Sequence, residues 1–146
     1  MNIFSMDSAF IRFFRKISDP LSRLAIFTVY FWFGLLKVVG LSPAGEMVRQ
    51  LAEKTVHFMP FPIFYILFAW FEVIIGLLFL FPRFTRVVIP LLLVHMVATA
   101  LPLFLLPAVS WQSLFVPTLE GQYILKNLVI IACAVGIASR LHHLTK

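Results

Sequence analysis

Apolar residues occur in four long runs along the chain, and the short segments between the runs carry most of the charged residues. An α-helix rises 1.5 Å per residue, so roughly 20 apolar residues are enough to cross a hydrocarbon layer of about 30 Å. The pattern predicts four transmembrane helices at about residues 21–41, 61–81, 87–107 and 121–140. Since no linker or internal repeat divides the chain, residues 1–146 are expected to form a single integral membrane domain, an all-α four-helix bundle.

Two shorter segments have an amphipathic pattern. Near the N-terminus, apolar residues recur at helical spacing at Phe10, Phe14, Ile17 and Leu21, and the basic residues lie mostly off that stripe. This pattern predicts an N-terminal interfacial helix on the inner leaflet, with a frayed basic tail as the alternative. Residues 43–58 show a similar alternation between the first two spans, which predicts a short external amphipathic helix.

The composition agrees with a lipid environment. Hydrophobic residues make up 62% of the chain and charged residues only 12%, whereas soluble domains carry roughly 25% charged residues. So few polar side chains cannot coat a globule in water. The single cysteine, Cys133, excludes a disulfide bond within one chain.

The net charge of +6 is unevenly placed. The segments on one predicted side of the bundle hold most of the basic residues, namely Arg12, Arg15, Lys16, Arg23, Arg83, Arg86, Arg140 and Lys146. The opposite loops hold only Arg49 and Lys54. By the positive-inside rule both termini are expected in the cytoplasm. The basic excess indicates topology and contact with anionic membrane lipids, and no nucleic-acid partner is expected.

Four ionisable residues fall inside the predicted spans: Lys37, Glu72, His95 and Lys126. A lone lysine or carboxylate at mid-span costs roughly 2.5–3.5 kcal/mol, so the four are expected to meet. Lys37 shares one stripe of the first span with Tyr30 and Gly34, and the predicted stripes face a polar pocket that opens outward. The alternatives are that either lysine extends to the outer headgroups and that His95 is a neutral, packed histidine.

The segment 107–121 is apolar for a connection between spans, and a short helix would satisfy its backbone. Trp111 and Glu120 are expected at the rim of the pocket. One histidine and one glutamate without close helical spacing are a weak ligand set, so no metal site is predicted.

Short motifs, one in each span, resemble the DoxX-like superfamily of small four-helix membrane proteins. They are Gly34-x-x-Lys37, Glu72-x-x-x-Gly76, Thr85-Arg86 and Lys126-Asn127-Leu128. The run from Gln122 to Asn127 is similar to the related reactive-chlorine-resistance membrane proteins. The resemblance implies a bundle in the bacterial cytoplasmic membrane, an association with redox or oxidative-stress proteins, and a recurrent pattern at Gly34, Lys37, Glu72, Gly76, Lys126 and Asn127.

Three functions remain open at this point. The first is a membrane subunit whose polar pocket binds a hydrophobic or quinone-like ligand and supports a redox or stress-response partner. The second is a non-catalytic scaffold or assembly factor, and the third is a small proton-coupled transporter, which would require a homo-oligomer. The sequence contains no nucleophile–base pair and no phosphate-binding loop, so no catalytic residue is assigned and enzymatic activity stays undecided. No cofactor is expected within the chain itself, and a bound quinone or lipid is left open.

Overall fold

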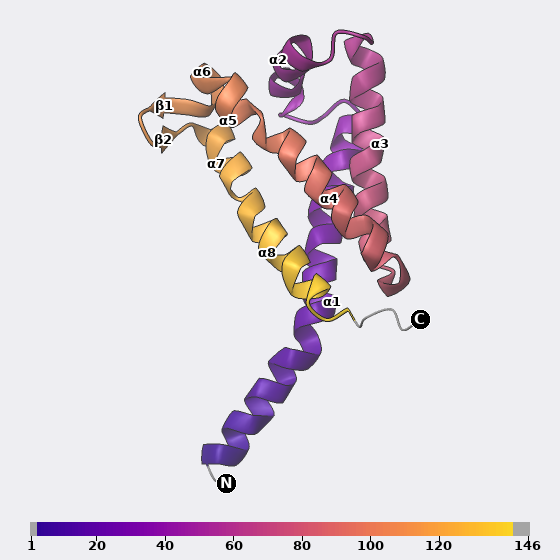
Figure 1. Cartoon of the computed structure of the whole chain (residues 1–146), viewed down its shortest axis with the longest axis vertical. Coiled ribbons are helices and arrows are strands. Elements are labelled where there is room, and N and C mark those ends of the chain that lie inside the picture. The colour runs from indigo at the N-terminus through magenta and orange to yellow at the C-terminus, as the bar shows by residue number, and fades with distance from the viewer. Residues whose placement is uncertain (1–2, 142–146) are drawn as a thin grey trace.

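The computed structural model describes residues 3–141, and it consists of helices with one small hairpin (Figure 1). The elements in chain order are α1 (Ile3–Val38), α2 (Gly45–Thr55), α3 (Phe61–Phe79), the short 3₁₀-helix η1 (Pro82–Phe84), α4 (Thr85–Ala100), α5 (Pro102–Leu105), α6 (Pro107–Ser110), β1 (Trp111–Ser113), β2 (Val116–Pro117), α7 (Leu119–Leu125) and α8 (Asn127–Ala138).

Within the described residues, four helical stretches are long and apolar enough to cross a membrane. They cover Met6–Val38, Phe61–Phe79, Pro82–Leu105 and Leu119–Ala138. The third stretch combines η1, α4 and α5, and the fourth combines α7 and α8. The helical architecture agrees with the predicted all-α helical bundle, and the four stretches have the length and composition of the spans of an integral membrane protein.

The first helix differs from the prediction, because no separate N-terminal helix precedes the first span. The helix α1 is continuous over 36 residues and includes Pro20 in its interior. At 1.5 Å per residue it is roughly 54 Å long, and its N-terminal half projects beyond the other helices (Figure 1). Proline removes one helical hydrogen bond, but an ion pair of 2.8 Å between Arg23 Nε and Asp19 Oδ2 bridges this turn.

The helices α1 and α3 pack closely at two glycines. A Cβ atom at Gly34 would lie 2.9 Å from the backbone nitrogen of Val73, and one at Gly76 would lie 2.7 Å from that of Phe31. Any larger residue would push the two backbones apart, so both glycines of the predicted pattern serve helix packing. Buried residues of α1, α3, α4 and α8 form the hydrophobic core, namely Ile26, Tyr30, Ile75, Phe79, Val88, Leu92, Met96, Ala134 and Ile137.

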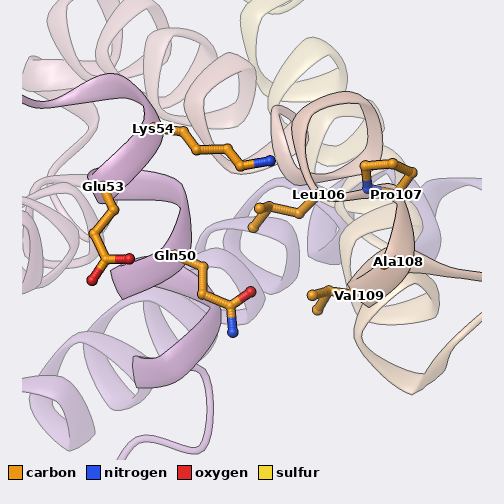
Figure 2. A pocket seen from close by; sticks show the side chains of 7 residues that line it. All are labelled: Gln50, Glu53, Lys54, Leu106, Pro107, Ala108 and Val109. Atoms are coloured by element: carbon orange, nitrogen blue, oxygen red, sulfur yellow. The ribbon is translucent and has the colours of Figure 1, made fainter.

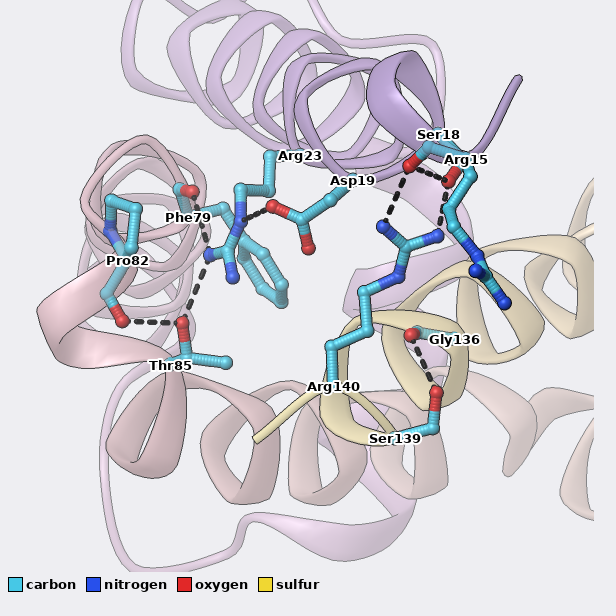
Figure 3. A network of polar contacts seen from close by, with 10 residues as sticks. All are labelled: Arg15, Ser18, Asp19, Arg23, Phe79, Pro82, Thr85, Gly136, Ser139 and Arg140. Carbon is cyan, nitrogen blue, oxygen red and sulfur yellow. Dashed lines mark hydrogen bonds and ion pairs between the residues drawn. The ribbon is translucent and has the colours of Figure 1, made fainter. Parts of the chain in front are cut away.

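A polar network ties the helices together at the end of the bundle nearest η1 (Figure 3). The buried guanidinium of Arg23 donates to Thr85 Oγ1 over 2.9 Å and to the carbonyl of Phe79 over 3.4 Å. Arg140 donates to the carbonyl of Arg15 over 3.1 Å and to the Ser18 hydroxyl. Arg15, Arg23 and Arg140, which the sequence analysis places on one side of the membrane, therefore lie at the end of the bundle nearest η1. Lys146, another of that group, lies outside the described residues.

The predicted short helix over residues 107–121 is present only in part. The helix α6 ends at Ser110, and the chain then forms the hairpin β1–β2, in which Trp111 pairs with Pro117. Phe115 has a positive φ of 59° in the turn. A two-stranded hairpin leaves the outer N–H and C=O groups of both strands unpaired, which is tolerated only outside the hydrocarbon layer, so the premise that this segment needs a fully paired backbone did not hold.

The amphipathic helix between the first two spans is present as α2, which is shorter than predicted. It contacts α3 and α5, and Lys54 Nζ donates to the carbonyl of Leu105 over 2.8 Å. On its exposed face, Arg49 pairs with both Glu46 and Glu53. Hydrogen bonds from Arg49 and Gln50 lower the pKa of Glu46 to about 2.

Replacing Arg49 with methionine is expected to return the pKa of Glu46 towards its ordinary value of about 4.5. A carboxyl whose pKa is lowered in the folded state stabilises the fold above its ordinary pKa, and this contribution disappears as the pH falls through the lowered value. In the unmodified chain the α2 pairing is therefore lost only as the pH approaches 2. An NMR titration of the Glu46 side chain in micelles measures the shift, and an unchanged titration curve in Arg49→Met would contradict the assignment.

Candidate functional site

The candidate site lies where α1, α3 and α4 meet. Lys37 Nζ donates to Glu72 Oε2 over 2.6 Å. The second oxygen of the same carboxyl group, Oε1, lies 3.1 Å from His95 Nε2. The other ring nitrogen, His95 Nδ1, lies 3.0 Å from the hydroxyl of Tyr30. These four residues form a continuous hydrogen-bonded series, called the buried polar chain below.

Helical spacing brings the four side chains together. Tyr30 and Lys37 are seven residues apart, which places them on one face of α1 two turns from each other. Arg23 occupies the same face a further seven residues back, at the end of the bundle nearest η1. Gly34 allows α3 to approach this face closely, so Glu72 reaches Lys37.

All four side chains of the buried polar chain are shielded. The relative exposure is 8% for Lys37, 6% for Glu72, 4% for His95 and 4% for Tyr30. Charges in such surroundings are stable only when paired and hydrogen-bonded. Among the described residues no fully buried side-chain nitrogen or oxygen lacks a hydrogen-bond partner.

The direction of the hydrogen bonds follows from the donors available. A carboxylate only accepts, so Glu72 accepts from the ammonium of Lys37 and from an N–H at His95 Nε2. A neutral imidazole then has an acceptor at Nδ1, which receives the hydroxyl hydrogen of Tyr30. His95 thus bridges the phenol of Tyr30 and the carboxylate of Glu72.

Aromatic rings enclose His95. The ring of Phe68 stacks on the imidazole with centroids 4.9 Å apart and planes inclined by 22°. Phe64 stacks on Phe68 in turn at 5.7 Å and 21°. Phe68 is half-buried, so this stack leads from the surface of α3 to the histidine. The ring of Phe68 therefore fills the space beside the imidazole face.

Lys126 does not join the other three ionisable residues. Its side chain is exposed, and its ammonium lies 4.7 Å from the ring centroid of Tyr123. The residue lies between α7 and α8, with a helical backbone conformation. The expectation that Lys126 approaches Glu72 is therefore wrong, and the alternative of an outward-directed lysine fits its exposure.

The remaining candidate residues have local roles. Asn127 Nδ2 donates to Thr99 Oγ1 over 3.3 Å, which links α8 to α4. Trp111 Nε1 donates to the carbonyl of Leu103 over 2.9 Å, so it fastens the hairpin to α5. Glu120 is exposed in the first turn of α7. None of the three contacts the buried polar chain.

The sequence interpretation placed Tyr30 on the stripe of Lys37 without a partner, and counted Arg23 only among the basic residues of one side. Both are buried polar residues of α1, and both were recognisable from the seven-residue spacing that ends at Lys37. Thr85, the partner of Arg23, was noted only as part of a motif. The contacts of Thr85 depend on the turn at η1, where its hydroxyl donates to the carbonyl of Pro82 over 2.6 Å.

The buried polar chain does not line an open outward pocket as the sequence predicted, because its four members are packed against one another. A pocket of about 390 Å³ lies elsewhere, between α2 and α5–α6 (Figure 2). Gln50, Glu53 and Lys54 line one side of it, and residues 106–109 line the other. Within residues 3–141 no group of three or more His, Cys, Asp or Glu residues is placed to hold a metal ion.

No protein-family model, curated protein or solved structure matches this chain.

Proposed function

We propose that this protein is a DoxX-like membrane subunit that binds a small hydrophobic, quinone-like ligand next to the buried polar chain and supports a redox or stress-response partner. The observation that carries the proposal is the series Lys37–Glu72–His95, which joins an ammonium, a carboxylate and an imidazole inside apolar spans. Ionisable groups held within a membrane at such a cost mark proton and ligand pathways.

The aromatic stack supports a planar ligand in particular. Phe68 and Phe64 lead from the surface of α3 to the imidazole face of His95. A quinone-like ring that takes the place of the Phe68 ring would stack on His95, and its carbonyl oxygen would accept a hydrogen bond from Lys37. Glu72 and His95 would then exchange the proton that accompanies reduction of the ligand by the partner.

Glu72→Gln is the variant that tests this proposal. Glutamine keeps the size of the side chain but removes the negative charge that orients Lys37 and His95. The affinity for a short-chain benzoquinone, measured by calorimetric titration of the protein in nanodiscs, is expected to fall about tenfold or more, which corresponds to about 1.4 kcal/mol.

Lys126→Met is the matched control, because Lys126 is a lysine of a membrane span that lies away from the buried polar chain. Its benzoquinone affinity is expected to equal that of the unmodified protein. Equal affinities for the unmodified protein and Glu72→Gln, or no binding by the unmodified protein, would overturn the proposal.

A scaffold or assembly factor is the second candidate, and the closed packing of the buried polar chain favours it. In that case the four residues only hold α1, α3 and α4 in register. The double variant Lys37→Met/Glu72→Leu replaces the ion pair by apolar side chains of similar length. In a co-purification from mild detergent, the double variant would keep its partner under either candidate function. The two candidates differ in benzoquinone binding, which only the ligand-binding subunit shows and which the double variant would lose.

The proposal also includes an orientation of the bundle in the membrane. The end that carries Arg23, Arg140 and η1 would face the bacterial cytoplasm, since it gathers basic residues. The N-terminal half of α1 exposes Phe10, Phe13 and Phe14 beyond the bundle. Such a surface is unfavourable in water, so this half of α1 would contact the inner leaflet, with its basic residues at anionic headgroups. The helix α2 would then lie at the outer surface.

A further inference from the structure

Tyr30 has no part in the ligand binding proposed above, yet its surroundings are specific. Its hydroxyl is buried and lies 3.0 Å from His95 Nδ1, which accepts the hydroxyl hydrogen when the ring proton is on Nε2. The opposite nitrogen of the same ring lies 3.1 Å from the carboxylate of Glu72. A phenol is thus coupled to a base, and that base is coupled to an anion that stabilises its protonated form.

We propose that Tyr30 is a redox-active tyrosine that gives up one electron to a lipid peroxyl radical while its proton moves to His95. Removing an electron from a phenol makes it a strong acid, and a charged phenol radical is unfavourable in an apolar interior. The oxidation therefore requires a hydrogen-bonded base that takes the proton in the same event. His95 supplies that base, and the proposal needs no quinone and no partner protein.

The step balances in electrons and protons. The O–H bond of Tyr30 breaks, an N–H bond forms at His95 Nδ1, and one electron passes to the peroxyl radical. Tyr30 becomes a neutral phenoxyl radical, and His95 becomes an imidazolium that shares the carboxylate of Glu72 with the ammonium of Lys37. The reduced peroxyl anion takes a proton from water at the membrane surface and becomes a lipid hydroperoxide.

The class of oxidant follows from the position of Tyr30. The residue lies within a membrane-spanning helix, two turns along α1 from Lys37, and is almost fully enclosed. Charged oxidants do not enter such a depth, whereas peroxyl radicals form on the acyl chains that surround α1. Electrons tunnel across a thin layer of packed side chains, so the radical does not need to touch the phenol.

The other two tyrosines provide internal controls. Tyr65 is half-buried in α3. Its hydroxyl lies beside Gly45, the first residue of α2, at 3.3 Å from the position that a Cβ atom would take there. Tyr123 is exposed, and the ammonium of Lys126 lies over its ring, 4.7 Å from the ring centroid. Neither environment supplies a neutral imidazole at hydrogen-bond distance, so oxidation at these positions lacks the coupled proton acceptor.

The test uses the full-length protein in liposomes that contain a lipid-soluble azo initiator, which generates peroxyl radicals in the bilayer. Freeze-quenched samples are analysed by electron paramagnetic resonance. The variant Tyr65→Phe/Tyr123→Phe keeps Tyr30 as the only tyrosine without altering the buried polar chain. Its phenoxyl signal is expected to equal that of the unmodified protein, and radical formation is expected to slow in deuterated buffer because a proton moves with the electron.

Tyr30→Phe is expected to lose the signal, and His95→Phe, which preserves the ring stacked on Phe68, is expected to lose the deuterium effect. Circular dichroism verifies that each variant is folded. No signal from Tyr65→Phe/Tyr123→Phe, an undiminished signal from Tyr30→Phe, or an unchanged deuterium effect in His95→Phe would overturn the proposal.

Discussion

Lys37→Met is expected to lower the free energy of unfolding by about 3 kcal/mol or more, because it leaves the carboxylate of Glu72 buried without its cation. The pair is short, at 2.6 Å, and both side chains are almost fully enclosed. The bond from His95 remains in the variant, but a neutral imidazole N–H compensates a buried negative charge poorly. Unfolding in mixed micelles with increasing dodecyl sulfate, followed by circular dichroism, measures the loss.

Two further variants separate this effect from a general intolerance of substitutions. Lys126→Met removes an exposed lysine and is expected to change the free energy of unfolding by less than about 1 kcal/mol. Lys37→Met/Glu72→Leu removes both charges and is expected to recover most of the stability lost in the single variant. Equal losses in Lys37→Met and Lys126→Met would contradict a buried ion pair.

Gly76→Ala is expected to destabilise the contact between α1 and α3 by about 1–3 kcal/mol through overpacking. The added methyl group would lie 2.7 Å from the backbone nitrogen of Phe31 and 3.2 Å from its Cα atom. Backbone atoms cannot rotate away, so the two helices must separate, and the separation also lengthens the hydrogen bonds of the buried polar chain. The same unfolding measurement detects the change.

Gly136→Ala is the matched control for this prediction. Gly136 also lies within a membrane span, but a Cβ atom there would have no other atom within 4 Å. Alanine has the higher helix propensity, so this variant is expected to be neutral or slightly more stable. A similar loss at both glycines would mean that Gly76 is not a helix contact.

The sequence was sufficient to predict the contacts of those ionisable side chains that carry a high free-energy cost when they are left unpaired inside a membrane. Glu72 lies too deep for its carboxyl group to reach water, so a partner on another span was required, and Lys37 and His95 were the ionisable residues within reach. Lys126 was placed wrongly because a lysine near a helix end extends to the surface at little cost. A sequence pattern alone does not decide between those two arrangements.

Other features depend on local geometry that periodicity does not carry. The break at Lys126 divides the fourth span into α7 and α8, and Pro20 leaves α1 unbroken although proline usually ends a helix. The hairpin β1–β2 stands where a short helix was predicted, because that prediction assumed a fully paired backbone under lipid, and a two-stranded hairpin leaves its outer edges unpaired. In contrast, the role of Tyr30 was within reach of the sequence, since it shares the spacing of Arg23 and Lys37.

Side chains from three separate helices meet in one enclosed hydrogen-bonded series. Solid-state NMR of the protein in bilayers, with ¹⁵N in the lysine side chains and ¹³C in the glutamate carboxyl groups, reports directly on this arrangement. We expect a strong dipolar contact between Lys37 Nζ and Glu72 Cδ that is absent in Glu72→Gln. A Lys37 ammonium that instead shows contacts to lipid phosphate and none to Glu72 would contradict the account.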